Sequence, residues 1–294
     1  MQSYDNTNEI RFRRVVEQID KLPSLPSIAT RLIDVVNSPV SSAEDAAELI
    51  QNDPGLTTKI LRLANSAFYG MPRSVSSVSS AVVILGFNTL RSVALSAAIM
   101  NMFDPSDGAF DYKRFWRHSA VCAMNAKSIA KKNMGLLLVD PEGAFCMGIL
   151  HDIGKLIFAR FFPAEYAVAQ QYALTHKVTT LQAEIKTLGV SHTQIGATLA
   201  DKWALPIDVE KVLVHHHDPK ETQTASELVN LVHVADNLCH QIGLDVFGGE
   251  TAHDVDDTSL KILGIRQEDY PEYVEIARQN LQISGEFLSI MGDG

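Results

Sequence analysis

This chain has little cysteine and no long apolar run. Its 294 residues include three cysteines, Cys122, Cys146 and Cys239. An odd number of cysteines among mostly apolar neighbours argues against a disulfide framework and favours a reducing compartment. No apolar run approaches the roughly 18 residues of a membrane-spanning helix, and the first residues contain no signal-peptide core. We therefore expect a cytoplasmic protein with no membrane partner.

Basic charge is also scarce. The chain has 25 Lys and Arg against 35 Asp and Glu, a formal net charge of -10 at pH 7. Nucleic acids and anionic membranes select surfaces rich in Lys and Arg, so nucleic acid is not expected as a partner either. The nearest basic cluster, Lys127, Lys131 and Lys132, is interpreted as a solvated helix face.

Alternating strand patterns with hairpin signals are absent, whereas apolar residues such as Leu56, Ile60 and Leu63 recur at helical spacing. Ser42 precedes two acidic residues and has the features of a helix N-cap. Asp53-Pro54 is expected to end one helix and open the next, because proline suits the first helical turn. These signals predict an all-α fold.

A loop rich in Asp, Pro, Ser and Gly, DPSDGAFD over residues 104–111, divides the chain. We predict a two-lobed protein, with an N-terminal helical lobe over residues 1–105 packed on a second lobe over residues 106–294. The C-terminal helices belong to the second lobe. His118 is the first histidine in the sequence, so any histidine-based metal chemistry is expected in the second lobe.

The second lobe carries histidines and aspartates in a suggestive order: His118, His151-Asp152, His192, His216-His217 and Asp236. Imidazoles and carboxylates without cysteine suit a divalent metal site rich in oxygen and nitrogen. His151 and Asp152 lie in GILHDIGKLIF, whose apolar flanks predict a helix. A buried aspartate there, or at Asp236 in an apolar helix, needs a partner or a metal.

Each of these residues also has an ordinary structural explanation. Hydrogen-bonded core histidines are common, and a helix dipole favours histidine near a C-terminus. The three histidines at 215–217 cannot all face one site, and Pro219 is expected to end their helix. His233 and His240 are interpreted as incidental. The order of the set is therefore the stronger signal.

That order resembles the HD superfamily of metal-dependent phosphohydrolases. From about Ile19 onwards, nearly the whole chain resembles the HDOD domain, the HD-related output domain of bacterial signalling proteins. The motifs that carry the resemblance are IDKLPSLP, QNDPGLTTKILRLANSAFYG, FWRHS, GILHDIGKL, SHTQIGATLADKWALP, HHDP and VHVADNL. The resemblance implies an all-helical fold in which an HD-like lobe follows an N-terminal helical lobe.

The resemblance also implies roles for individual residues. The positions of the superfamily's metal ligands are taken here by His118, His151, Asp152 and Asp236. The additional ligands of related HD-GYP phosphodiesterases correspond to His192 and to His216 or His217. Lys155 matches a lysine that faces the phosphate in those enzymes, so a catalytic role would fall to Asp152 and Lys155. The implied cofactor is one or two divalent ions, with Fe, Mn or Ni preferred.

The sequence departs from the HD-GYP pattern after His217, where it reads DPKETQTA without the GYP signature. This departure argues against cyclic di-GMP hydrolysis. The favoured hypothesis is a signal-transduction module that binds signalling proteins and retains an HD-type metal site, because a fold does not itself carry an activity. The alternative is a metal-dependent phosphohydrolase or phosphodiesterase that acts on a nucleotide or another phosphodiester.

Overall fold

The computed structural model describes residues 13–21, 24–25, 27–38, 40–66, 69, 74–103, 110–222, 226–246 and 255–292. Within these ranges the regular structure is helical, and the only β-type pairing is an isolated bridge between Met134 and Leu137. The predicted all-α fold is confirmed. The predicted lobe boundary between residues 105 and 106 lies outside the described residues.

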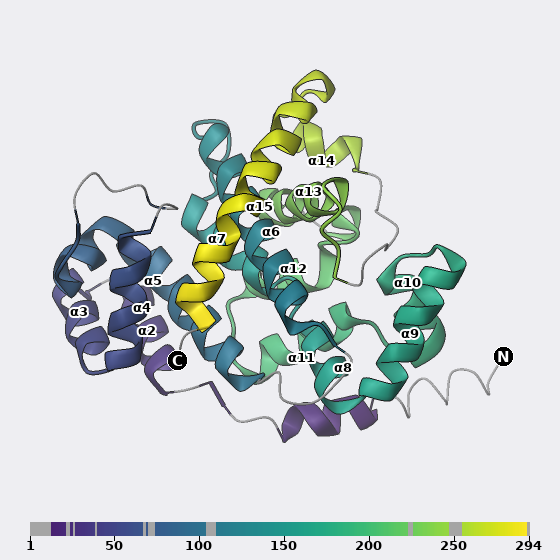
Figure 1. Ribbon diagram of the computed structural model, residues 1–294, viewed down its shortest axis with the longest axis horizontal. Coiled ribbons are helices and arrows are strands. Elements are labelled where there is room, and N and C mark those ends of the chain that lie inside the picture. Colours follow the sequence, from purple (N-terminus) through teal and green to yellow (C-terminus); the bar gives the residue numbers. More distant parts are fainter. Residues whose placement is uncertain are drawn as a thin grey trace.

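The N-terminal lobe is the group of helices at the left of Figure 1, coloured purple to blue. Three shorter helices each pack on the fourth. Their bounds are α2 (Ser27–Asn37), α3 (Ala43–Gln51), α4 (Pro54–Ala64) and α5 (Val78–Met102). Ser42 forms a capping box with Asp45 at the start of α3. Asp53 caps α4, whose first residue is Pro54. Both predicted helix starts are confirmed.

The fourth helix, α5, is interrupted at Gly86. The backbone there has φ 77° and ψ 164°, a conformation that favours glycine because a side chain would clash with the backbone. Helical periodicity in the sequence does not reveal this break. The helix α5 also packs against α7 of the second lobe, so it joins the two lobes.

The second lobe is built around α6, which packs on α7, α13 and α15. Its elements are α6 (Tyr112–Lys132), α7 (Pro141–Leu150), α8 (Gly154–Phe161), α9 (Pro163–His176), α10 (Thr180–Leu188), α11 (His192–Lys202), α12 (Ile207–His215), η1 (Pro219–Glu221), α13 (Glu227–Gln241), α14 (Asp257–Ile262), η2 (Gln267–Asp269) and α15 (Tyr270–Gly292). A helix over residues 13–20 also lies against this lobe, where Arg14 stacks over Phe162.

The C-terminal helix α15 contacts both lobes. It crosses α6 and then reaches α4 and α5, as the yellow ribbon in Figure 1 shows. The buried Lys59 of α4 donates a hydrogen bond of 2.6 Å from Nζ to the carbonyl oxygen of Met291. The last turn of the chain is thereby tied to the N-terminal lobe.

A second buried lysine corrects one interpretation of the sequence. Lys127 was expected on a solvated face but is buried on α6. Its ammonium lies 2.5 Å from a carboxylate oxygen of Glu142 on α7 and 4.2 Å from the centre of the Tyr69 ring. The salt bridge and the cation–π contact compensate the loss of hydration, whereas Lys131 and Lys132 are exposed as expected.

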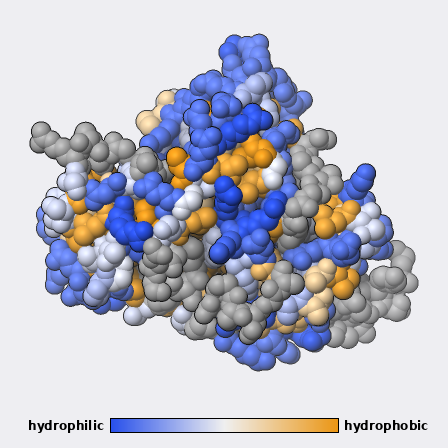
Figure 2. Space-filling view, in the orientation of Figure 1, coloured by the Kyte–Doolittle hydropathy of each residue, from blue (hydrophilic) through white to orange (hydrophobic). Residues whose placement is uncertain are grey.

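The face of the molecule in Figure 2 is largely hydrophilic, and its hydrophobic residues gather in separate patches. Among the described helices, none combines the length and the apolar character that crossing a membrane requires.

The contact between α6 and α7 leaves no room for a side chain at Gly148. A Cβ atom built there would lie 2.5 Å from the Cα of Ala123. We predict that Gly148→Ala lowers the free energy of unfolding by about 1–3 kcal/mol, because the two backbones must separate. Chemical denaturation measures this change.

Gly143→Ala on the same helix is the matched control. Its Cβ would meet only Asp140, at an ordinary contact distance of 3.5 Å, so the change should be neutral or stabilising by up to about 1 kcal/mol. Equal stability of the two variants would contradict the close approach of α6 and α7.

Candidate metal centre

The structure brings the seven predicted ligands together from five segments of the second lobe. His118 lies on α6, His192 opens α11, and Asp236 lies within α13. His216 and His217 follow directly after α12. His151 and Asp152 were expected inside one helix, but they occupy a turn between α7 and α8. That expectation was wrong.

Close packing explains the turn. Gly154 opens α8, and a Cβ atom there would lie 2.0 Å from the carbonyl oxygen of His192. The backbone of α11 therefore approaches the turn that carries His151 and Asp152 to a distance that only glycine permits. Apolar residues on both sides of the turn gave it the appearance of a continuous helix, because buried turns and buried helices share the same hydropathy.

A first cluster forms around His118 and His151. Their Nε2 atoms lie 3.4 Å apart. The Nε2 of His118 is 3.1 Å from Oδ1 of Asp236, and the Nε2 of His151 is 3.3 Å from Oδ2 of Asp152. Two imidazoles and two carboxylates thus converge within the buried core.

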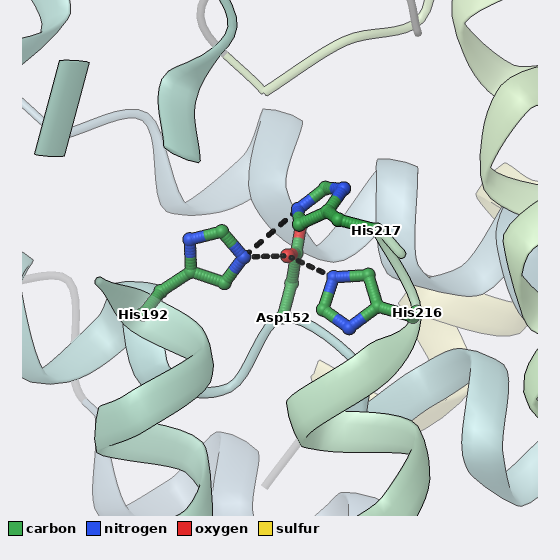
Figure 3. A group of neighbouring side chains, drawn as sticks. All are labelled: Asp152, His192, His216 and His217. Atoms are coloured by element: carbon green, nitrogen blue, oxygen red, sulfur yellow. Dashed lines mark hydrogen bonds and ion pairs between the residues drawn. The ribbon is translucent and has the colours of Figure 1, made fainter. Parts of the chain in front are cut away.

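A second cluster forms on the other oxygen of Asp152. Its Oδ1 lies 3.4 Å from Nε2 of His192 and 3.6 Å from Nε2 of His216. The Nε2 of His217 is 3.0 Å from that of His192. Figure 3 shows the three imidazoles around the carboxylate, His192 from the start of α11 and the other two from the end of α12. Asp152 consequently belongs to both clusters, one through each oxygen.

The outer nitrogen of four histidines is held by a hydrogen bond to a fixed acceptor. Three of these acceptors are backbone carbonyl oxygens, which lie 2.8–2.9 Å from Nδ1: His118 faces Leu244, His151 faces Gly148, and His216 faces Val212. The fourth acceptor is a carboxylate oxygen of Glu184, 2.6 Å from Nδ1 of His192. Nδ1 must donate its proton to these acceptors, so the neutral rings present the lone pair of Nε2 to the clusters. This is the arrangement of metal-binding histidines.

Several buried atoms inside the clusters have no hydrogen-bond partner among the described residues. They are Oδ1 of Asp152, Oδ1 of Asp236 and Nε2 of His216. The lone pairs of His118 and His151 also face each other, so a proton or a cation must lie between them. Buried polar atoms are normally satisfied, and a divalent cation in each cluster would satisfy these atoms. The donor set therefore fits divalent metal.

The charges of the site favour a cation. Burial raises the pKa of Asp152, but Lys155 and His151 together hold it well below its usual range. Burial acts on Asp236 in the same way, and His240 and His118 hold its pKa well below the usual range. Both carboxylates are therefore ionised at neutral pH, at a position where an uncompensated negative charge is costly.

The pKa shifts of His151 in the first cluster and His216 in the second cluster have opposite directions. Burial lowers the pKa of His151, but Asp152 and Cys122 outweigh it and raise the pKa well above its usual value. Burial dominates at His216 and lowers its pKa to about 4. A cation in the first cluster would therefore displace a proton, whereas His216 already offers its lone pair at neutral pH.

Several residues that support the ligands were not predicted from the sequence. The buried carboxylate of Glu184 accepts hydrogen bonds from both the ring and the backbone N–H of His192. His233, interpreted as incidental, donates from Nδ1 to the carbonyl oxygen of His216. His240, set aside in the same way, lies 3.7 Å from Oδ1 of Asp236. Tertiary structure brings His233 to His216, whereas His240 follows Asp236 by one turn of α13, a spacing that is visible in the sequence.

Comparison with known proteins identifies the family of the chain. A model of the HDOD domain matches residues 22–219. The chain belongs to the HDOD family. An uncharacterized protein of Treponema pallidum (strain Nichols) is 27% identical over 228 residues, which cover 74% of this chain and 42% of that protein. The chain thus spans less than half the length of this relative.

Two crystal structures resemble the whole fold. One is an HDOD domain protein of unknown function from Geobacter sulfurreducens, with a TM-score of 0.81, 26% identity and coverage of 97% of this chain and 98% of that chain. The other is a candidate phosphohydrolase from Shewanella amazonensis SB2B, with a TM-score of 0.72, 27% identity and coverage of 93% and 97%. The HDOD fold therefore accounts for nearly the entire chain.

The carboxylate behind His192 provides a test of the second cluster. We predict that Glu184→Gln weakens metal binding by the second cluster by about 10–100-fold, because the amide holds the ring of His192 less firmly and does not raise its basicity. Competition with a metal-sensitive chelator measures the affinity. Glu48→Gln, at an exposed position of α3, is the control, and equal affinities in both variants would exclude a role for His192.

Proposed function

We propose that this chain is a metal-loaded signal-transduction module that acts through protein–protein interaction. The observation that carries the proposal is the shared carboxylate of Asp152, whose two oxygens face two groups of histidine nitrogens within the buried core. Such a site ties together α6, α11, α12, α13 and the turn after α7. Metal binding would therefore stabilise the second lobe and set its shape.

Burial favours a structural or regulatory metal. The side chains of His118, His151, Asp152, His192 and His216 are each no more than 1% exposed, and Asp236 is 3% exposed. A catalytic metal site keeps a coordination position open to substrate. Among the seven ligands only His217 is half-buried, so the second cluster is the one closer to solvent.

Two ions account for the geometry better than one. The first would be held by His118, His151, Asp152 and Asp236, and the second by Asp152, His192, His216 and His217. Mixed imidazole and carboxylate donors suit Fe, Mn or Ni, while Ca²⁺ prefers oxygen ligands alone. The partners of such a module would be other signalling proteins.

A phosphohydrolase is the second candidate function, and Lys155 favours it. Its buried ammonium lies 2.7 Å from Oδ2 of Asp152, next to both clusters. Two bound ions would activate a water molecule and neutralise phosphoryl oxygens. Lys155 would add a positive charge for the substrate. The resemblance to the Shewanella amazonensis protein is compatible with this function.

Metal content tests the proposed module. We expect about two equivalents of transition metal in the purified protein and fewer than one in Asp152→Ala, because that variant loses the ligand common to both clusters. Inductively coupled plasma mass spectrometry measures the content. Asp34→Ala, at an exposed position of α2, should retain the metal. A folded wild type that contains no metal and takes up none would refute the proposal.

Turnover separates the two functions. We expect that metal-loaded protein does not hydrolyse p-nitrophenyl phosphate, its bis-ester or nucleotides faster than Asp152→Ala does. Lys155→Gln retains every predicted ligand and is the informative variant. Hydrolysis by wild type that disappears in Lys155→Gln at unchanged metal content would establish the phosphohydrolase and displace the signalling module.

A further inference from the structure

A groove of about 500 Å³ lies on the second lobe, away from the metal ligands. The N-terminal ends of α7, α12 and α13 meet there beside the loop that joins α6 to α7, and we call it the three-helix groove. Its lining is mainly apolar and includes Leu138, Val139, Met147, Leu205, Val209 and Leu228.

Large aliphatic side chains stand exposed beside the groove. Leu138, on its wall, is 96% exposed, and Ile207, at the start of α12, is 61% exposed. Met134 and Leu136, in the same loop as Leu138, are exposed as well. Single exposed apolar residues are ordinary, but an exposed aliphatic side chain on the wall of an apolar groove, as at Leu138, favours an interaction surface.

The charged residues that line the groove are all acidic. Asp140, Asp208 and Glu227 contribute to the groove, and no lysine or arginine does so. Each carboxylate lies within or beside the first turn of a helix, whose N-terminus carries roughly half a positive charge. The ammonium of Lys211 lies 3.8 Å from Asp208. With this charge and the three helix N-termini included, the groove remains net negative by roughly half a charge. A partner with positive side chains is therefore complementary.

We propose that the three-helix groove binds one amphipathic helix of a partner protein, with aliphatic anchors in the groove and Lys or Arg beside them. Helix-in-groove recognition uses apolar anchors about three, four and seven residues apart. The walls are helix ends and a loop without an open strand edge among the described residues, so strand addition has no template here. This inference rests on the proposed role as a protein-binding module.

The groove and the metal centre share three helices. Each of these helices begins at the groove. His151 follows the last residue of α7, His216 and His217 follow the last residue of α12, and Asp236 lies within α13. From Asp140 to His151 the chain advances by about 16 Å at the helical rise per residue. A partner that shifts these helix ends would shift the ligands. Metal and partner would then alter each other's affinity by the same factor, as linkage requires.

A library of 16-residue helical peptides displayed on phage tests the proposal with the whole metal-loaded protein as target. We expect enrichment of peptides that combine Leu, Ile or Met anchors on one face with Lys or Arg beside them. A selected peptide should bind Leu138→Asp at least about tenfold more weakly than wild type, because the change places a charge on the exposed apolar wall of the groove. Asp208→Lys should also weaken binding.

Val83→Asp is the matched control, since Val83 is 71% exposed but lies on α5 of the other lobe. It should bind the peptide as wild type does. The proposal would be overturned if the wild type enriched no more peptides than the Leu138→Asp variant does, or if the selected peptides were acidic. So would a dimer of the chain that Leu138→Asp dissociates in analytical ultracentrifugation, because the groove would then bind a second copy.

Metal measurements on the same samples keep the two proposals separate. Normal metal content without peptide binding would refute only the proposal that the three-helix groove binds a helix. Peptide binding by a metal-free wild type would support that proposal and refute the metal-loaded module. Removal of metal by a chelator should change the peptide affinity by about fivefold or more. Equal affinities would overturn the coupling between the groove and the metal centre.

Discussion

The carboxylate of Asp152 is the group on which the arrangement of the second lobe depends. It is 1% exposed, ionised and placed so that each oxygen faces a different set of imidazoles. A buried charge of this kind is costly unless it is compensated. Lys155 supplies one positive charge at 2.7 Å, and the histidine nitrogens around the carboxylate are suited to share a cation with it. The helices that carry those nitrogens have to converge on this point.

Convergence requires unusually close backbone contacts, and two glycines permit them. Gly148 lets α7 lie against α6, and Gly154 lets the start of α8 lie against His192. The carbonyl groups and the carboxylate behind the histidines then fix which ring nitrogen faces inward. The site is thus defined as much by backbone packing and hydrogen bonds to Nδ1 as by the identity of its ligands. The contacts of α15 with both lobes extend this rigidity to the N-terminal lobe.

Part of this structure could be predicted from the sequence because its causes are local. Ser42 and Asp53 cap helices through contacts three residues away, and apolar periodicity indicates which segments are helical. The histidines and aspartates of the clusters were identified by their order, although the sequence could not show which oxygen or nitrogen each one presents. The loop at residues 104–111 predicted two lobes, and the resemblance to HDOD domains implied the same organisation.

Other features depend on contacts between distant segments. The turn at His151 and Asp152 was mistaken for helix because its neighbours are equally apolar. Glu184 belongs to a different helix from His192, and no spacing rule connects them. Lys127 was assigned to the surface because its partner Glu142 lies on another helix. In each case the missing information is which buried polar groups face one another, and hydropathy does not encode it.

We propose that the carboxylate of Asp152 would hold one cation in each of the two clusters of the second lobe. Anomalous diffraction from crystals of the protein as purified, recorded on both sides of the absorption edge of the metal found in it, tests this claim directly. We expect two peaks, one beside His118, His151 and Asp236, the other beside His192 and His216, with Asp152 between them. Well-ordered ligand side chains with no anomalous peak in either cluster, even after soaking with Mn²⁺ or Ni²⁺, would contradict it.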